Sequence, residues 1–153
     1  IKSEISKSNA ILGGEMSGHI FYNDNWYGFD DGIFAALKLL EILSSKESTT
    51  HEVFNKFTQL FNTPEIKIAV EDDEKFEIVE QLKVKLKPEG YNSILIDGLR
   101  LENKDCWGLV RASNTTPSLI LRFEANTEQK LMEIQELFQK TLLEISTNLK
   151  FLN

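Results

Sequence analysis

The sequence predicts two parts of different architecture, an N-terminal segment over residues 1–62 and a small α+β domain over residues 63–153. The first segment combines short apolar runs, a glycine-rich loop and one strongly apolar helix. The second shows strands of alternating apolar and polar residues, interspersed with two amphipathic helices and joined by short connections. This order predicts an antiparallel sheet with helices on one face. A chain of 153 residues, 41% of them hydrophobic, is long enough for one large or two small domains.

Short apolar runs dominate the start of the first segment. Residues 1–9 are polar and charged and are interpreted as the tail of a helix, so we read the chain as a piece of a longer protein. Residues 10–13 are an apolar run ending in glycine, which is typical of a buried strand that stops at a loop. Residues 19–22 are predicted to form a second short strand.

Two helices complete the first segment. Residues 33–43 follow the acidic Asp30-Asp31-Gly32 and are apolar on most sides, so we expect this helix to be buried on most sides. A shorter helix is predicted over residues 51–61, with one apolar face. Asn62-Thr63-Pro64 breaks it, and we place the domain boundary there. The residues of the apolar face are Val53, Phe54, Phe57 and Leu60.

In the second part, residues 66–70 alternate as a half-buried strand. A helix then begins at Asp72-Asp73 and ends at residues 88–90, and Thr127 caps a final amphipathic helix. Asp97-Gly98 is either a bend within one strand or a two-residue hairpin. The remaining strands are predicted over residues 93–97, 98–102, 106–112 and 118–124.

Composition limits the possible partners. With 17 basic and 24 acidic residues the net charge is -7, which argues against nucleic acid or an anionic membrane surface. The single cysteine, Cys106, excludes a disulfide framework and a cysteine-based zinc site, and we interpret it as a small half-buried hydrophobe. No apolar run approaches the ~20 residues of a membrane span and no signal peptide is visible, so we expect a cytoplasmic protein.

The turn at residues 111–117 could hold a phosphate group. Arg111 ends a strand, and the guanidinium group can bind phosphate through two hydrogen bonds. The hydroxyl and amide groups of the loop can occupy the remaining phosphate oxygens. The alternative is an ordinary hairpin turn with a solvated arginine, which residue types alone favour. The loop residues concerned are Ser113, Asn114, Thr115 and Thr116.

The loop at residues 13–19 could bind a sugar. Glu15 can accept hydrogen bonds from a sugar diol beside Ser17, and His19 can contact phosphate or carry a proton. The alternative is a glycine-rich turn with a satisfied histidine. A metal site from Glu15 and His19 lacks a third ligand nearby in the sequence.

Two further groups are explained without a ligand. Asp30-Asp31 could bind Mg²⁺, but acidic residues at a helix start are explained more simply by the helix dipole. A cluster of aromatic residues could stack on a sugar ring, but core packing is the favoured interpretation. These residues are Tyr22, Trp26, Tyr27 and Phe29.

Taken together, three motifs favour ligand binding over the purely structural interpretations of these loops. Gly-Gly-Glu-Met-Ser-Gly-His at 13–19, Trp-Tyr-Gly-Phe-Asp-Asp-Gly at 26–32 and Arg-Ala-Ser-Asn-Thr-Thr-Pro at 111–117 occur in one order. They resemble the bacterial phosphomannomutase/phosphoglucomutase branch of the α-D-phosphohexomutase superfamily, over essentially the whole chain.

The resemblance implies a fold class of α/β plus α+β. Residues 1–62 would be the end of a Rossmann-like α/β third domain, and residues 63–153 a fourth domain similar to the TATA-box-binding protein. Glu15 and Ser17 would bind sugar hydroxyls, with His19 nearby. The loop from Arg111 would hold the non-reacting phosphate through Arg111, Ser113, Asn114 and Thr115.

The resemblance also implies a reaction. The full-length enzyme would interconvert the 1- and 6-phosphates of mannose or glucose through a phosphoserine and a bisphosphorylated sugar. The family's catalytic serine and its Mg²⁺ loop match nothing in this chain, so we expect residues 1–153 alone to bind no metal and to be inactive. The expected partners are a hexose phosphate and the missing N-terminal domains.

Two alternatives remain open. Phosphoglucosamine mutases tend to carry Ser-Gly-Thr-Glu-Pro where this chain has Ser-Asn-Thr-Thr-Pro at 113–117, which favours the mannose/glucose branch. The chain could instead be a non-catalytic module that binds sugar phosphates. Sequence upstream of Ile1 would distinguish an enzyme from such a module.

Overall fold

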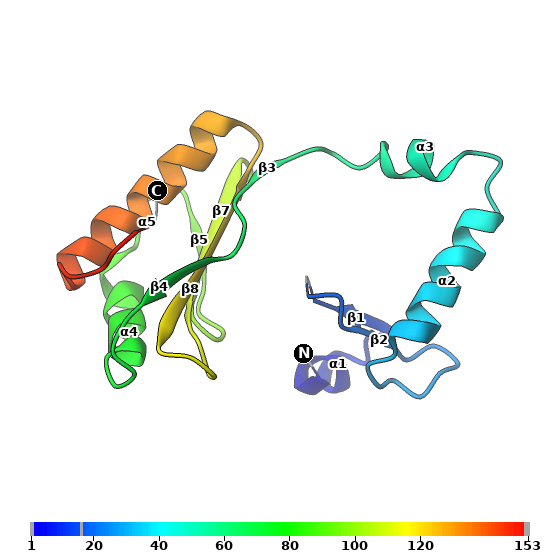
Figure 1. Ribbon diagram of the computed structural model, residues 1–153, viewed down its shortest axis with the longest axis horizontal. Helices are drawn as coiled ribbons and strands as arrows, with labels where there is room; N and C mark the ends of the chain where they lie inside the picture. The colour runs from blue at the N-terminus through cyan, green and yellow to red at the C-terminus, as the bar shows by residue number, and fades with distance from the viewer. Residues whose placement is uncertain (1, 16, 152–153) are drawn as a thin grey trace. The chain divides into compact units, whose positions relative to one another are not determined.

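A computed structural model describes residues 2–15 and 17–151, so Ile1 and Met16, which fall within the expected first helix and sugar-binding loop, lie outside the described residues. The chain divides into two compact units, an N-terminal unit of residues 1–58 and a C-terminal unit of residues 59–153 (Figure 1). Each unit has its own sheet.

The N-terminal unit consists of a two-stranded sheet and three helices. Strands β1 (Leu12–Gly14) and β2 (Ile20–Tyr22) pair antiparallel, so the loop between them is the tip of a hairpin. Helix α2 begins where the side chain of Asp31 accepts a hydrogen bond from the backbone N–H of Phe34 at 2.9 Å. The helices are α1 (Lys2–Ser8), α2 (Gly32–Ser44) and α3 (Thr50–Phe54).

The prediction that the apolar helix is buried on most sides is wrong for the described chain. Helix α2 has no buried residue, and the side chains of Ile33 and Leu40 are 79% and 60% exposed. The same holds for the run at 10–13, where Leu12 is exposed rather than part of a buried strand. Two short strands and three helices provide too little surface to cover these side chains. Among the described residues of this unit, the buried hydrophobic one is Phe21.

The helix predicted over residues 51–61 is also shorter than expected. It spans only Thr50–Phe54, starting with a capping box between Thr49 and Glu52 and ending where Asn55 donates back to the carbonyl of His51. Phe54 and Phe57 are both exposed. Because no described element covers the apolar face, tertiary packing does not extend the helix beyond its capped first turns.

The C-terminal unit is an antiparallel sheet covered on one face by two helices, as predicted (Figure 1). The strand order is β3-β8-β7-β6-β5, and β4 pairs with β8 along the same edge as β3. Strands β5 and β6 pair antiparallel across Asp97-Gly98, so this dipeptide lies in a hairpin turn rather than in a bent strand. The strands are β3 (Phe61–Asn62), β4 (Ile66–Ala69), β5 (Asn92–Ile94), β6 (Leu99–Glu102), β7 (Cys106–Ala112) and β8 (Ser118–Ala125); the helices are α4 (Lys75–Lys85) and α5 (Glu128–Ile145).

The core lies between the sheet and these two helices. Alternate residues of β7 and β8 point toward the helices, while their neighbours lie on the opposite, partly exposed face. The rings of Phe123 and Phe138 meet edge to face at 5.4 Å, and Gly108 leaves the space that Phe138 fills. Fully buried residues at the centre include Ile68, Leu82, Val110, Leu121, Ile134 and Leu142.

Candidate functional site

The segment 113–117 is the turn between the two central strands β7 and β8. Arg111 pairs with Ile120 in the register of these strands, and Ala112 pairs with Leu119. Alternation along β7 buries Ala112 among the core residues and places the half-buried Arg111 on the face opposite the helices. The sheet therefore presents the guanidinium group directly before the turn.

Ser113 organises this turn from within. Its side chain is buried, and Oγ accepts hydrogen bonds from the backbone N–H of Thr116 at 3.1 Å and of Thr115 at 3.3 Å. The Thr116 hydroxyl also donates to Ser113 Oγ, at 2.8 Å. From the sequence, Ser113 is predicted to be one of several equivalent phosphate contacts. The structure instead gives its oxygen an internal role, which leaves its single hydroxyl proton as the group it can offer to a ligand.

Asn114 and Thr115 lie at the exposed tip of the turn. The main chain on either side is fixed, because the N–H of Ser113 donates to the carbonyl of Ser118 at 2.9 Å. The tip therefore combines a rigid base with accessible amide and hydroxyl groups. This arrangement is suited to an anion that needs several donors in a fixed geometry.

Gly98 packs directly against the strand that carries Arg111. A Cβ atom at this position would lie 2.3 Å from the carbonyl oxygen of Val110 and 2.9 Å from Cβ of Arg111. The residue also has a φ of 135°, which glycine adopts freely. The β5–β6 turn thus contacts β7 beside Arg111. From the sequence, the Asp-Gly dipeptide predicts a turn but not this contact.

A buried lysine lies behind the turn and was not singled out from the sequence. Lys75, the first residue of α4, donates through Nζ to the carbonyl of Thr116 at 3.3 Å and to Asp72 at 2.6 Å. The contact joins residues that are 41 positions apart, so no local sequence signal could have revealed it.

In the N-terminal unit, the candidate sugar-binding residues lie at the tip of the β1–β2 hairpin. The backbone N–H of Glu15 donates to the carbonyl of His19 at 3.0 Å, and Gly18 turns the chain with a φ of 88°. The Ser17 hydroxyl donates to the Glu15 carboxylate at 3.4 Å. All three predicted side chains are exposed, so the hairpin presents a carboxylate, a hydroxyl and an imidazole to solvent.

His19 is held by Asp30. Its Nδ1 lies 2.5 Å from Asp30 Oδ2, and the backbone of Asp30 forms a bridge with Phe21 in β2. A carboxylate at Nδ1 fixes the orientation of the ring and leaves Nε2 as the atom that can meet a ligand. The helix-dipole interpretation treated Asp30 and Asp31 alike, but they have different roles: Asp31 caps α2, whereas Asp30 orients the histidine.

The aromatic cluster is only partly packed. The rings of Trp26 and Phe34 stack at 4.0 Å, and Tyr22 meets Phe34 edge to face at 5.4 Å. Tyr27 and Phe29 stack on one another but remain exposed. Tyr22 is half-buried, whereas Trp26 remains 36% exposed although it stacks on Phe34. Core packing therefore describes Tyr22 and is wrong for the other three rings.

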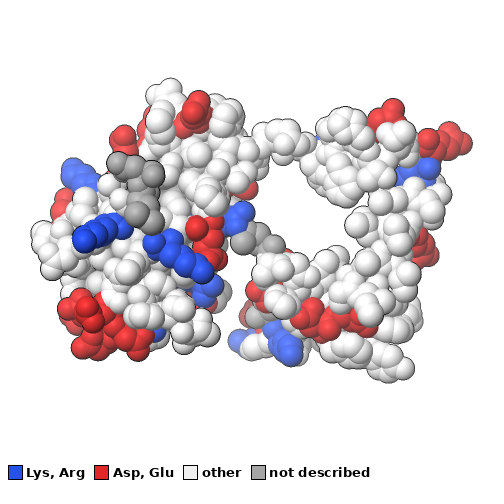
Figure 2. All heavy atoms as spheres, viewed as in Figure 1, with Lys and Arg blue, Asp and Glu red and all other residues white. Residues whose placement is uncertain are grey.

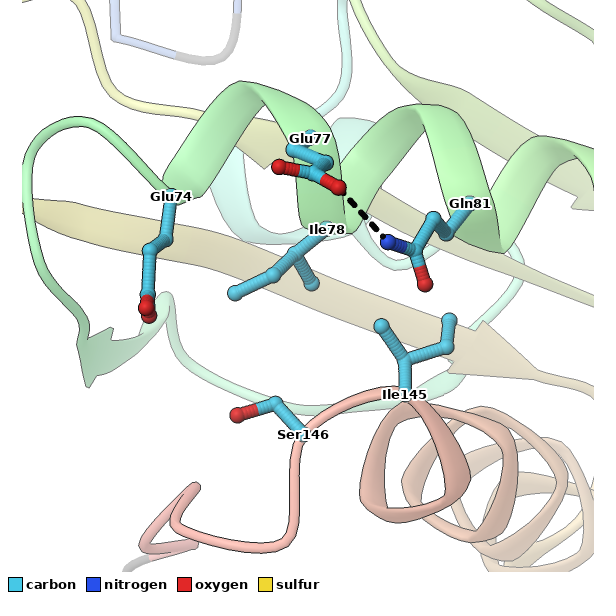
Figure 3. A pocket seen from close by; sticks show the side chains of 6 residues that line it. All are labelled: Glu74, Glu77, Ile78, Gln81, Ile145 and Ser146. Carbon is cyan, nitrogen blue, oxygen red and sulfur yellow. Dashed lines mark hydrogen bonds between the residues drawn. The ribbon is translucent and has the colours of Figure 1, made fainter.

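Two further features of the described residues provide no site for a metal ion or for phosphate. Within residues 2–15 and 17–151 no three His, Cys, Asp or Glu side chains are grouped so that they could hold a metal ion. A hollow of about 170 Å³ lies between α4 and the end of α5, lined by Glu74, Glu77, Ile78, Gln81, Ile145 and Ser146 (Figure 3). Its charged groups are carboxylates, which repel phosphate. In Figure 2 acidic side chains gather in a cluster at the lower left of the C-terminal unit, and the basic side chains visible on that unit lie apart from this cluster.

None of the helices within residues 2–15 and 17–151 is both long and apolar enough to cross a membrane.

Two family models match this chain on either side of the unit boundary. Residues 1–61 match "Phosphoglucomutase/phosphomannomutase, alpha/beta/alpha domain III", and residues 65–140 match "Phosphoglucomutase/phosphomannomutase, C-terminal domain". The chain belongs to the phosphoglucomutase/phosphomannomutase family. The resemblance inferred from the three motifs is thereby confirmed. The predicted fold class is confirmed as well, with an α/β third domain followed by an α+β C-terminal domain.

Individual members of the family agree with this assignment. The chain is 46% identical over 97% of its length to "Phosphomannomutase/phosphoglucomutase" from Pseudomonas aeruginosa, and 47% identical over 97% to "Phosphoglucomutase" from Neisseria meningitidis serogroup A. A crystal structure of a phosphoglucomutase/phosphomannomutase family protein from Burkholderia thailandensis matches 98% of the chain with a TM-score of 0.87 and 36% identity.

The match covers only part of these family members. The chain spans 32% of the length of each of the two curated relatives and 31% of the crystallised chain. Its two parts match the third-domain model and the C-terminal-domain model of the family.

Proposed function

We propose that this chain is the substrate-recognition part of a phosphohexomutase that interconverts the 1- and 6-phosphates of mannose or glucose. The observation that carries the proposal is the preorganised turn after Arg111, in a domain that belongs to this family. We further propose that the chain consists of two domains that meet near residue 62, close to the boundary between the compact units at residues 58 and 59, and that the protein is cytoplasmic.

The turn at 111–117 is proposed to hold the phosphate group that does not react. Arg111 supplies a charged fork, while Asn114 and Thr115 supply donors at the exposed tip. Ser113 keeps the tip in shape through three accepted hydrogen bonds and can add its own proton. Each charge-assisted hydrogen bond contributes roughly 1.5–3 kcal/mol, so a few of them suffice for useful phosphate affinity.

The hairpin tip of the N-terminal unit is proposed to read the sugar. The Glu15 carboxylate accepts hydrogen bonds from two adjacent hydroxyl groups, and Ser17 completes this contact. His19, oriented by Asp30, offers Nε2 to a sugar hydroxyl or to a phosphate oxygen. A hydroxyl-reading loop and a phosphate clamp can hold a sugar by one end while the other end reacts.

The chemical step is proposed to depend on residues outside this chain. In the whole protein a phosphoserine would transfer its phosphoryl group to the sugar, giving a bisphosphorylated intermediate that returns the other phosphate. Mg²⁺ would neutralise charge on the transferred group. Residues 1–153 contribute binding and orientation, so we expect no mutase turnover from them alone in a coupled assay.

Substitution of Arg111 tests the phosphate clamp. We expect the chain to bind glucose 6-phosphate at about millimolar Kd, and Arg111→Met to weaken binding at least about tenfold because two charge-assisted bonds are lost. Amide chemical shifts of residues 112–116 during titration give the Kd. Arg100→Met is the control, since Arg100 lies on the same sheet face but pairs with Glu102 at 2.8 Å. Equal affinity of wild type and Arg111→Met would refute the clamp.

The phosphoglucosamine alternative is less well supported. A "Probable phosphoglucosamine mutase" from Thermococcus gammatolerans is 32% identical over 94% of the chain, lower than the 46% of the Pseudomonas aeruginosa relative. The Asn-Thr-Thr sequence at 114–116 also favours the mannose/glucose branch, as the resemblance implies. A larger response of residues 15–19 to glucosamine 6-phosphate than to glucose 6-phosphate would reverse this preference.

A further inference from the structure

Lys75 occupies an unfavourable position for a lysine. It is the first residue of α4, and only 4% of its surface is exposed. A helix N-terminus carries partial positive charge, so a cation there is disfavoured, and burial of an ammonium group adds a desolvation cost. Neither the helix dipole nor core packing explains a lysine at this position.

The contacts of Lys75 connect the helix to the turn at 113–117. Nζ lies 2.6 Å from Asp72 Oδ1 and 3.3 Å from the carbonyl oxygen of Thr116. The Asp72 side chain is largely exposed, whereas that of Lys75 is buried, so the ion pair runs from the interior toward the surface. The ring of Phe76 lies 5.2 Å from the ammonium group.

The accepted bonds orient the carbonyl groups of the turn. Thr116 O accepts from Lys75 and also from the backbone N–H of Ser118 at 2.9 Å, which occupies both of its lone pairs. The next carbonyl, of Pro117, accepts from the N–H of Val70 at 3.1 Å. Donors from the β4–α4 segment therefore bind the carbonyl oxygens at the end of the turn. A carbonyl oxygen turned toward a phosphate group would repel it.

From this arrangement we propose that Lys75 is a positioning residue for the phosphate-binding turn, holding the Thr116 carbonyl and placing a buried positive charge behind residues 113–117. This inference rests on the proposed function of that turn. The ammonium group is shielded from solvent, so its favourable field at the turn is screened less than that of a surface lysine. Its ion pair with Asp72 reduces this field, and the hydrogen bond to Thr116 is therefore the larger contribution.

A purely structural role makes a different prediction. If Lys75 only anchors α4, its replacement lowers the free energy of unfolding but leaves the phosphate affinity of the folded molecules unchanged. A positioning role changes the affinity itself, and Lys75→Arg, which keeps the charge and the donors, restores part of it.

Three variants of the full chain distinguish these cases: Lys75→Met, Lys75→Arg and Lys130→Met. Lys130 is the control: like Lys75 it lies in the first turn of a helix and pairs with a carboxylate, Glu133, at 2.6 Å, but its side chain is exposed. Helix α5 follows the C-terminal end of β8, whereas the turn precedes its first residue, Ser118, so about 23–27 Å of strand lies between them.

Inorganic phosphate and glucose 6-phosphate are the probes, and the amide shifts of residues 112–116 give the Kd. We expect Lys75→Met to raise the Kd for both about tenfold, Lys75→Arg to raise it about threefold or less, and Lys130→Met to leave it unchanged. If wild type binds but Lys75→Met binds equally well, the inference is overturned and the proposed phosphate clamp stands. If wild type shows no response at residues 112–116, the proposed function fails and the inference falls with it.

A measurement on the unaltered chain decides the matter if Lys75→Met does not fold. The ¹⁵Nζ resonance of Lys75 should shift on saturation with inorganic phosphate, while that of Lys130 stays in place. A Lys75 resonance that does not move at saturating phosphate would overturn the inference.

Discussion

Gly98 determines how closely the β5–β6 turn can approach Arg111. With a φ of 135° and a Cβ position 2.3 Å from the carbonyl oxygen of Val110, it meets both a backbone and a steric restriction. A side chain here must displace either the turn or β7. The geometry of the phosphate turn therefore depends on a residue that has no chemical role in binding.

We expect Gly98→Ala to lower the free energy of unfolding by about 2–4 kcal/mol, from strain at positive φ together with the clash. Gly90→Ala is the matched control: Gly90 also has a positive φ, 83°, but no atom lies within 4 Å of its Cβ position. Its loss should be about 1 kcal/mol, from backbone strain alone. Chemical denaturation measures both, and equal losses would show that the contact with β7 does not matter.

Tyr91 makes the free energy of unfolding decrease at high pH. Burial, together with a hydrogen bond to Cys106 at 3.6 Å, raises the pKa of the Tyr91 phenol to about 12. The folded state therefore favours the neutral phenol, whose usual pKa is about 10. The stabilisation is fully present below pH 10 and is lost as the pH rises toward 12.

The comparison of wild type with Tyr91→Phe isolates this effect from other groups that titrate at high pH. Between pH 9 and pH 11 wild type should lose more of its free energy of unfolding than the variant does, by up to about 1 kcal/mol, because solvent screens the partly buried phenol. Denaturation at the two pH values gives the difference. Parallel losses in both proteins would mean that the phenol titrates alike in the folded and unfolded states.

At the residue scale, the sequence indicated which side chains are polar and which loops carry them. It did not indicate which of them are buried and hold the loop and which are exposed to a ligand. Ser113 was indistinguishable from Thr115 by type, yet one is buried and accepts hydrogen bonds whereas the other is exposed. The partners of Lys75 and His19 lie 41 and 11 positions away. Such contacts depend on strand register and chain reversal, which residue type and local spacing do not encode.

Among the elements, helix α5 is the one that local sequence signals define best. Thr127 accepts a hydrogen bond from the backbone N–H of Lys130 at 3.2 Å, and the apolar residues that follow at intervals of three or four face the sheet. The cap and the periodicity agree, and the helix begins at the residue after the predicted cap.

Thr127→Ala should therefore lower the free energy of unfolding by about 1 kcal/mol, because one N–H of the first turn loses its partner. Thr127→Ser, which keeps the hydroxyl, should stay within about 0.5 kcal/mol of wild type. Denaturation of the three proteins tests the cap. An alanine variant as stable as the serine variant would mean that the hydroxyl of Thr127 contributes nothing.

Helix α2 shows where element-scale reasoning reaches its limit. The hydrophobic pattern identified the helix, predicted over residues 33–43, but the inference that it is buried required a surface to cover it. Within the N-terminal unit that surface is too small, and Ile33, Leu37 and Leu40 remain exposed. Periodicity tells which faces are apolar. It does not tell what covers them.

At the scale of the whole molecule, the two units differ in how completely they form a core. The C-terminal unit has a continuous core between its sheet and helices, and its residues range from Ile68 to Leu149. The alternation of apolar and polar residues predicted this sheet well, because all of its strands and connections lie within the C-terminal unit. Each proposed binding loop lies within a single unit, so each can be tested separately.

The most direct test of the account is a comparison of three ligands on the wild-type chain: inorganic phosphate, glucose and glucose 6-phosphate. The backbone amide shifts of each loop are followed during each titration. The account predicts that phosphate moves residues 112–116, and that glucose 6-phosphate moves these and also the described residues of the 14–19 hairpin tip, with weaker effects from glucose. Shifts that cluster elsewhere, such as around Glu74 and Ser146, or silence of residues 112–116 with both phosphate ligands, would contradict it.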